Sequence, residues 1–149
     1  MTQRGILGIA GDPSSDVHSV QGVASGTPVP VTDKQTSGTL SDAGTDRTVK
    51  YAIIDAATSG DNTLVAAVAS RKIRVLSIFY VASAAVTTRV ESGAGGTALT
   101  GQMQLAANGG FVLPYSPHGW FETAVNTLLN LELSGAISVD GALTYVEIA

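Results

Sequence analysis

The chain contains no cysteine, and its positively charged residues end well before its C-terminus. Without cysteine there is neither a disulfide bond nor a thiolate metal ligand, which fits a protein folded in a reducing cytoplasm. No Lys or Arg follows Arg89, although acidic residues continue to Glu147. A nucleic-acid-binding surface needs clustered cations that neutralise phosphates, so this charge distribution argues against nucleic acid as a partner.

Long apolar segments are missing as well. A transmembrane helix needs about 20 consecutive apolar residues, and the apolar runs of this chain are shorter or are interrupted by glycine and polar residues. The run Ile6–Ala10 is too short for a signal peptide and contains a glycine. We therefore expect a soluble protein that has no membrane partner and is not exported.

Residues 1–47 are dominated by Gly, Pro, Ser, Thr and Asp, and have few large apolar side chains. Pro28 and Pro30 bias the residues before them toward extended conformations. Long segments without regular structure are usually either functional or disordered. We interpret residues 1–47 as an extended arm that becomes ordered on a partner, and a disordered linker is the alternative. The candidate partner-binding residues of the arm are Val20, Val23, Val29 and Val31.

Residues 48–149 are typical of one all-β domain. About eight short strands are expected there, with turn residues between them and no amphipathic helix. In the segment Thr127–Ser134, three leucines alternate with polar residues, as in a strand with one buried face. This pattern favours an antiparallel β-sandwich or jelly roll. The expected organisation is an N-terminal arm, residues 1–47, followed by a β-sandwich domain, residues 48–149.

Three local patterns give more specific expectations. The alternation within Lys72–Ala82 slips near Leu76, which indicates a β-bulge or burial on both faces. The pair Asn108–Gly109 lies between apolar runs and predicts a tight hairpin turn. The pair Asp140–Gly141 predicts another turn, which would separate the last two strands.

No catalytic, cofactor-binding or metal-binding signature is found in the sequence. The glycine-rich run 93–101 lacks both the Lys of a Walker loop and the third glycine of a dinucleotide-binding loop, so a surface loop is the better interpretation. Ser116, His118 and Glu122 are close along one turn, which does not give the geometry of a catalytic triad. Neither His118 nor His18 has a second His at ligand spacing. We expect no enzyme activity, no cofactor and no metal ion.

Trp120 is a further candidate for partner binding. Because Trp120 and Phe121 are adjacent, they point to opposite faces if they lie in a strand. One of the two rings is expected in the core, and the other at a subunit contact, where aromatic side chains are enriched. Alternatively, Trp120 stacks on a sugar, as it would in a carbohydrate-binding jelly roll that recognises a host surface.

Four segments resemble small virion structural proteins of tailed bacteriophages in their style and order. They are Val20–Val31, Tyr51–Val65, Glu91–Gly101 and Gly119–Thr123. Proteins of this kind often resemble capsid decoration proteins, also called cement proteins. The resemblance implies a β-sandwich that forms a trimer on the capsid surface and has arms that reach across neighbouring capsomers.

The resemblance also implies a function. We expect a non-enzymatic virion protein, made in the host cytoplasm and located on the capsid surface. Its expected partners are further copies of itself, with a trimer favoured, and the major capsid protein or other virion proteins. A tail or head-fibre protein is the alternative within the same class. An extended arm suits this role because it gains main-chain hydrogen bonds on a free strand edge with little demand on its sequence.

Overall fold

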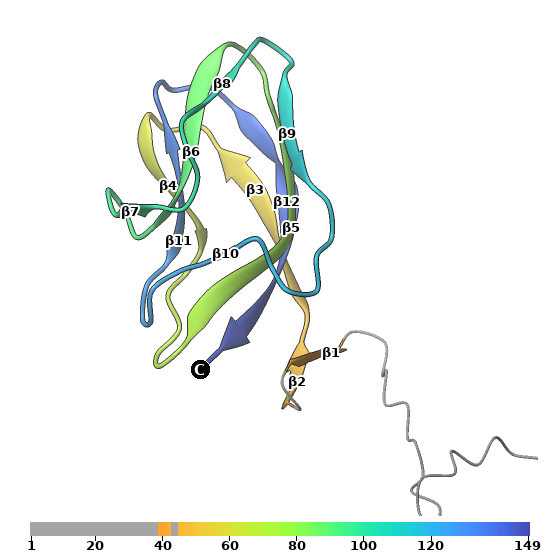
Figure 1. Ribbon diagram of the computed structural model, residues 1–149. Coiled ribbons are helices and arrows are strands. Elements are labelled where there is room, and N and C mark those ends of the chain that lie inside the picture. The colour runs from red at the N-terminus through yellow and green to blue at the C-terminus, as the bar shows by residue number, and fades with distance from the viewer. Residues whose placement is uncertain (1–38, 43–44) are drawn as a thin grey trace, which may run out of the picture. The chain divides into compact units, whose positions relative to one another are not determined.

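The computed structural model describes residues 39–42 and 45–149. The chain divides into two units, Met1–Lys34 and Gln35–Ala149, and everything below concerns the second. The predicted all-β class is confirmed, because two antiparallel sheets pack face to face as a β-sandwich (Figure 1). This described part contains no helix that is long and apolar enough to cross a membrane.

Twelve strands are found in the described residues. Their bounds are β1 (Thr39–Asp42), β2 (Thr45–Thr48), β3 (Lys50–Ala56), β4 (Gly60–Val65), β5 (Lys72–Ala82), β6 (Val86–Ser92), β7 (Thr97–Ala98), β8 (Met103–Leu105), β9 (Gly110–Leu113), β10 (Phe121–Glu122), β11 (Leu129–Leu133) and β12 (Val139–Ile148).

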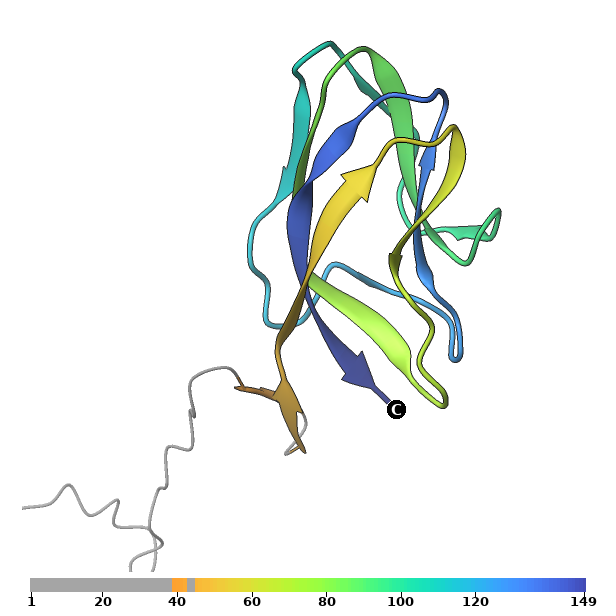
Figure 2. The same cartoon turned by 180° about the vertical axis from the view of Figure 1, so that it is seen from behind.

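The strand order identifies the sandwich as a jelly roll. One sheet has the order β3-β12-β5, with β9 and β10 both paired to the free edge of β5. The other has the order β4-β11-β6, with β7 and β8 both paired to β6. Consecutive strands from β3 to β6 alternate between the sheets, and so do β8, β9, β11 and β12 (Figure 2). Eight strands in two sheets connected in this way form two Greek keys.

The main core lies between the sheets and follows the predicted alternation. On β11, Leu129, Leu131 and Leu133 are buried in this core, whereas Asn130 and Glu132 lie on the other face of the strand, where Asn130 is buried as well. On β5, Ile78 and Tyr80 also point into this core. Period-two burial of this kind leaves each sheet with an outward face, and the chemistry of those two faces distinguishes them.

The irregularity predicted near Leu76 is confirmed as a β-bulge. Ser77 pairs with Thr144 and Val75 pairs with Tyr145, so Leu76 has no partner on β12. The extra residue turns the side chain of Leu76 away from the main core. It is buried instead in a second, smaller core with Val146 and Ile148, against which Leu40 and Val49 pack.

The hairpin β1–β2 contributes to this second core. Its register places Thr39 opposite Thr48, and Leu40 packs against the buried cluster around Leu76. The boundary predicted between residues 47 and 48 therefore falls at the end of a strand that belongs to the folded part. Residues 1–38 of the predicted arm lie outside the described residues, and an arm there stays a prediction.

Two predicted turns do not have the form that the sequence predicts. Asn108 has the positive φ of a tight turn, 59°, but β8 and β9 pair in different sheets, so the turn crosses between sheets and forms no hairpin. Asp140 and Gly141 lie inside β12, which runs unbroken from Val139 to Ile148. At Gly141 the backbone of β12 comes so close to β5 that no side chain fits, which is why a glycine stands in mid-strand.

Candidate interaction surface

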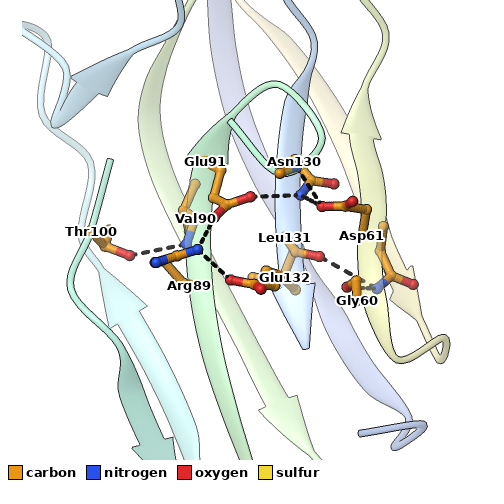
Figure 3. Close-up of polar contacts among 11 residues, drawn as sticks. Gly60, Asp61, Arg89, Val90, Glu91, Thr100, Asn130, Leu131 and Glu132 are labelled. Atoms are coloured by element: carbon orange, nitrogen blue, oxygen red, sulfur yellow. Dashed lines mark hydrogen bonds and ion pairs between the residues drawn. The ribbon is translucent and has the colours of Figure 1, made fainter. Parts of the chain in front are cut away.

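The outward face of the sheet β4-β11-β6 carries a network of charged and amide side chains (Figure 3). Arg89 contacts the carboxylates of Glu91 and Glu132, with 2.7 Å between its Nη2 and Glu132 Oε2. The amide nitrogen of Asn130 donates to Asp61 Oδ1 at 2.6 Å and to Glu91 Oε2 at 3.2 Å. Each side chain of this network therefore has a partner within the chain, which Glu91 and Asn130 need because they are buried.

Glu91 is the most unusual member of the network, because its side chain is 0% exposed. The glycine-rich run follows β6 directly, and the backbone N–H of Gly95 donates to Asp61 Oδ1 at 2.9 Å. Burial of a carboxylate is costly unless it is paired, and Arg89 supplies the opposite charge. The run 93–101 thus bonds to the sheet of its own chain, which supports its interpretation as a surface loop.

The outward face of the other sheet, in contrast, carries exposed apolar side chains. Ile53 on β3, Ala142 on β12, Phe79 on β5 and Val112 on β9 are cross-strand neighbours in one row. The exposed fractions are 72% for Ile53, 53% for Phe79 and 67% for Val112. Adjacent exposed apolar side chains on four strands form a continuous patch. We call this patch the apolar face; it comprises Tyr51, Ile53, Phe79, Val81, Val112 and Ala142.

The next row of the same face carries two hydroxyl groups that form a hydrogen bond to each other. Ser77 on β5 and Thr144 on β12 are cross-strand neighbours, and their hydroxyl oxygens are 2.6 Å apart. A buried hydroxyl without a hydrogen-bond partner destabilises a structure. Because one O–H group of this pair already has its acceptor in the other hydroxyl, a second surface that covers the pair would take only one O–H group away from water.

Charged residues stand at the two ends of the apolar face. At one end, Asp55 and Asp140 are exposed cross-strand neighbours. At the other end, Arg74 and Lys72 contact Glu122, with 2.6 Å from Arg74 Nε and 3.6 Å from Lys72 Nζ to its carboxylate oxygens. The face is therefore acidic at one end, apolar in the middle and, by formal charge, positive at the other end.

The chain covers part of this outward face with its own residues. Near the basic end, Leu76, Val146 and Ile148 are buried, and Leu40 of the β1–β2 hairpin packs against them. The apolar face, farther along the same strands, has no such cover within the described residues. Contiguous exposed apolar patches on soluble proteins mark interaction sites, so this is the candidate functional site of the described part.

Beside the hairpin lies a polar hollow of about 300 Å³. Arg47, Lys50, Arg71 and Glu147 are among the residues that line it. Glu147 Oε1 accepts a hydrogen bond from Lys50 Nζ at 2.6 Å, and this bond raises the pKa of Lys50 above its usual value. Within residues 39–42 and 45–149, no three His, Asp or Glu side chains are grouped as a metal site would require.

Trp120 lies beside the apolar sheet. Trp120 precedes β10 and is 47% exposed, whereas Phe121 packs against the main core, so the expectation that one of the two rings enters the core is confirmed. The indole Nε1–H donates to the carbonyl oxygen of Pro114 at 2.7 Å, and the backbone N–H donates to that of Val75 at 2.9 Å. A role of Trp120 in a subunit contact, or in sugar binding, stays a prediction.

The structure places none of the other predicted partner-binding residues, because Val20, Val23, Val29 and Val31 lie outside the described residues. Conversely, the apolar face is not among the features predicted from the sequence. A signal for it exists in β5, where the run Ile78–Ala82 is apolar at every position. A strand that is apolar on both faces is typical of a strand that is covered on both faces, and within the described residues the main core covers only one face of this run.

Comparison with known proteins identifies no relative: no family model, no curated protein and no solved structure matches the chain.

Proposed function

We propose that the protein is a non-enzymatic structural subunit of a bacteriophage virion, which decorates the capsid as a homo-oligomer and stabilises the shell. Its proposed partners are further copies of itself and the major capsid protein. The single observation that supports a subunit role is the contrast between the two outward faces. One face is a network of paired polar groups, and the other is apolar and exposed.

This contrast supports an assembly role because the two faces belong to one small sandwich. A monomer in solution has no use for Ile53, Phe79 and Val112 side by side on an open sheet, since each loses the stabilisation of burial. Obligate and long-lived interfaces are more apolar than the rest of a protein surface. A chain that pairs its polar groups internally and leaves its apolar groups open is suited to work as part of an assembly.

The fold is compatible with the same role. Jelly rolls occur in viral capsid proteins and in lectin domains. The virion assignment itself comes from the resemblance of four segments of the chain to small virion proteins. Three of these segments lie in the described sandwich. In this proposal the segment before Thr39 acts as the arm that grips the shell, and it joins the sandwich through the hairpin β1–β2.

The proposal is tested with expanded heads of the phage that encodes the protein, prepared without it. The full chain should bind these heads and raise the temperature at which they disrupt. A truncated protein, residues 39–149, should lose most of this effect, although it keeps the hairpin that packs on the second core. The truncation starts at residue 39 because a later start would also remove Leu40.

Two results would contradict the proposal. One is that the full chain neither binds the heads nor changes their disruption temperature. The other is a cryo-EM map of the phage that places the protein on the tail or on a head fibre, which would favour the alternative within the same class. Circular dichroism of both proteins serves as the control for folding.

A second candidate function is carbohydrate binding, which the partly exposed ring of Trp120 favours. Aromatic rings stack on sugars, and lectins share the jelly-roll fold. The test is a glycan array with the wild type and Trp120→Ala. Binding that disappears in a folded Trp120→Ala protein would support this function, whereas an array without any signal from the wild type would rule it out.

A further inference from the structure

We infer that the apolar face is a self-pairing surface, on which a second copy of the chain docks face to face about a two-fold axis. This inference rests on the proposed function, in which the chain works as an oligomer, and adds where and how the copies meet. Three properties of the face support it: its size, its internal hydrogen bonding and the distribution of its charges.

The size of the face matches a protein–protein interface. A buried aromatic side chain contributes roughly 150–250 Å². Scaled by their exposed fractions, the residues of the apolar face present on the order of 700 Å². A standard interface buries ~800 Å² on each partner. Two such faces therefore offer the area that a stable pair needs.

The middle of the face is free of charge and has few polar groups. Its row Ile53–Ala142–Phe79–Val112 is apolar across four strands. The hydroxyls of Ser77 and Thr144 in the next row bond to each other at 2.6 Å. An identical uncharged face is a matching surface for such a region, since each side would bury no charge and only one O–H group without an acceptor. Sheets pack face to face in this way at about 10 Å.

The charges at the ends favour a two-fold arrangement. On β12 the middle of the uncovered region lies between Ala142 and Thr144. Asp140 stands on one side of this midpoint, and Val146, the cross-strand neighbour of Arg74, stands equally far on the other. A two-fold axis that crosses the strands at the midpoint, between the two faces, brings the acidic end of each copy over the basic end of the other. Complementary charges in this arrangement fix the register of the pair.

The acidic end also gains from a partner. Asp55 and Asp140 are directly opposite each other on β3 and β12, and both are exposed. Like charges at such positions destabilise a sheet. The cations of a second copy, Arg74 and Lys72, would offset this repulsion. The carboxylate pair is thus a weakness of the single chain that pairing removes.

The inferred pairing differs from the trimer that the resemblance to decoration proteins implies. A two-fold interface uses the same patch on both copies and closes after two of them, whereas a ring of three needs two different patches. The pairing therefore predicts a dimer, or a larger assembly with an even number of copies. The number of copies in the assembly therefore distinguishes this inference from the trimer that the resemblance implies.

The test is sedimentation equilibrium of the full chain at micromolar concentrations. The wild type should be a dimer or an even-numbered assembly. Ile53→Lys and Val112→Lys place a cation at opposite edges of the apolar row, and each should weaken the association by about tenfold or more, as expected for the loss of apolar contacts at an interface. Asp55→Lys should weaken it too, with a smaller effect at high salt, since exposed charges are screened.

The matched control is Thr63→Lys, which places the same side chain at an exposed position on β4, in the other sheet. It should leave the association unchanged. Urea unfolding of every variant shows that weaker association does not come from an unfolded chain. A wild type that is a monomer or a trimer would overturn the inference, and so would Ile53→Lys and Val112→Lys variants that associate like the control.

Failure of this inference is distinguishable from failure of the proposed function, because self-association is measured without phage heads. If the wild type is monomeric and Val112→Lys abolishes binding to heads, the apolar face docks the shell and self-pairing is overturned while the virion role stands. If the wild type pairs but does not bind heads, the inference stands and the virion role fails.

Discussion

Gly141 on β12 lies directly against Phe79 on β5: a Cβ atom at Gly141 would stand 2.0 Å from the carbonyl oxygen of Phe79. The same atom would be 2.7 Å from the Cα atom of Tyr80, which is the cross-strand partner of Gly141. No real side chain approaches backbone atoms so closely. The glycine therefore allows β12 and β5 to come together at the acidic end of the apolar face, next to Ala142.

We predict that Gly141→Ala destabilises the protein strongly. The added methyl group must push β12 away from β5, and overpacking of this kind costs about 1–3 kcal/mol, occasionally more. The free energy of unfolding, measured by urea denaturation, should fall by about 3 kcal/mol. Gly101→Ala is the matched control, because a Cβ atom there has no heavy atom within 4 Å. Equal stability of the two variants would show that the strands are farther apart than described.

The same glycine shows where prediction from the sequence failed. Asp140–Gly141 has the composition of a turn, but the reason for this glycine is the approach of β5, which is more than fifty residues earlier in the chain. Local composition cannot distinguish a glycine that bends the chain from one that makes room for another strand. The hairpin predicted at Asn108 was wrong for a similar reason. The conformation of Asn108 was predictable, but the sheet that each flanking strand would join was not.

Features that depend on period-two patterns were predictable. The alternation of Leu129, Leu131 and Leu133 gave the buried face of β11, and the slip near Leu76 gave the bulge. The apolar face was not predicted because Phe79 and Tyr80 are both apolar enough to be buried. Which of them faces the core depends on the bulge that precedes them and on the second sheet, and neither is visible in the pattern of β5 alone.

A second prediction concerns Tyr80, which is buried in the main core. Its hydroxyl is 3.0 Å from Thr88 Oγ1. Tyr80→Phe removes this bond and leaves the hydroxyl of the buried Thr88 without it. The free energy of unfolding at pH 7 should fall by about 1 kcal/mol, the usual effect of one lost hydrogen bond. A variant as stable as the wild type at this pH would mean that Thr88 has another partner.

The order of stability of the wild type and Tyr80→Phe should reverse in alkaline solution. Burial raises the pKa of Tyr80 from 10.0 to about 12. Because the folded-state pKa is the higher one, the stability of the wild type is fully present below pH 10 and is lost as the pH rises from 10 to 12. Two pKa units correspond to about 2–3 kcal/mol. Tyr80→Phe lacks this loss and should become the more stable protein near pH 12, as measured by urea unfolding across this range.

A third prediction compares two carboxylates that contact the same arginine. Arg89 reaches both Glu91 and Glu132, but Glu91 is completely buried and the side chain of Glu132 is 38% exposed. Glu91→Gln leaves the buried part of the network without its negative charge and should cost about 3 kcal/mol of unfolding free energy. Glu132→Gln should cost less than ~1 kcal/mol, because exposed ion pairs contribute little. Similar values for the two variants, measured by urea unfolding, would contradict the burial of Glu91.

A fourth prediction tests whether the hairpin β1–β2 belongs to the folded unit, although it lies largely within the segment that the sequence predicts as an arm. A protein that starts at Thr39 keeps Leu40 on the second core, whereas one that starts at Val49 loses it and exposes Leu76 and Val146. At roughly 25 cal/mol per Å² of apolar surface, exposure of this cluster should cost about 1–3 kcal/mol.

The measurement is urea unfolding of the two truncated proteins beside the full chain. The protein that starts at Thr39 should match the full chain in its free energy of unfolding, and the one that starts at Val49 should be less stable than both. Leu40→Ser in the full chain is the matched control, because it removes the same contact without shortening the chain. If both truncated proteins are as stable as the full chain, the hairpin adds nothing to the fold, and the arm ends where the sequence predicts it, at residue 47.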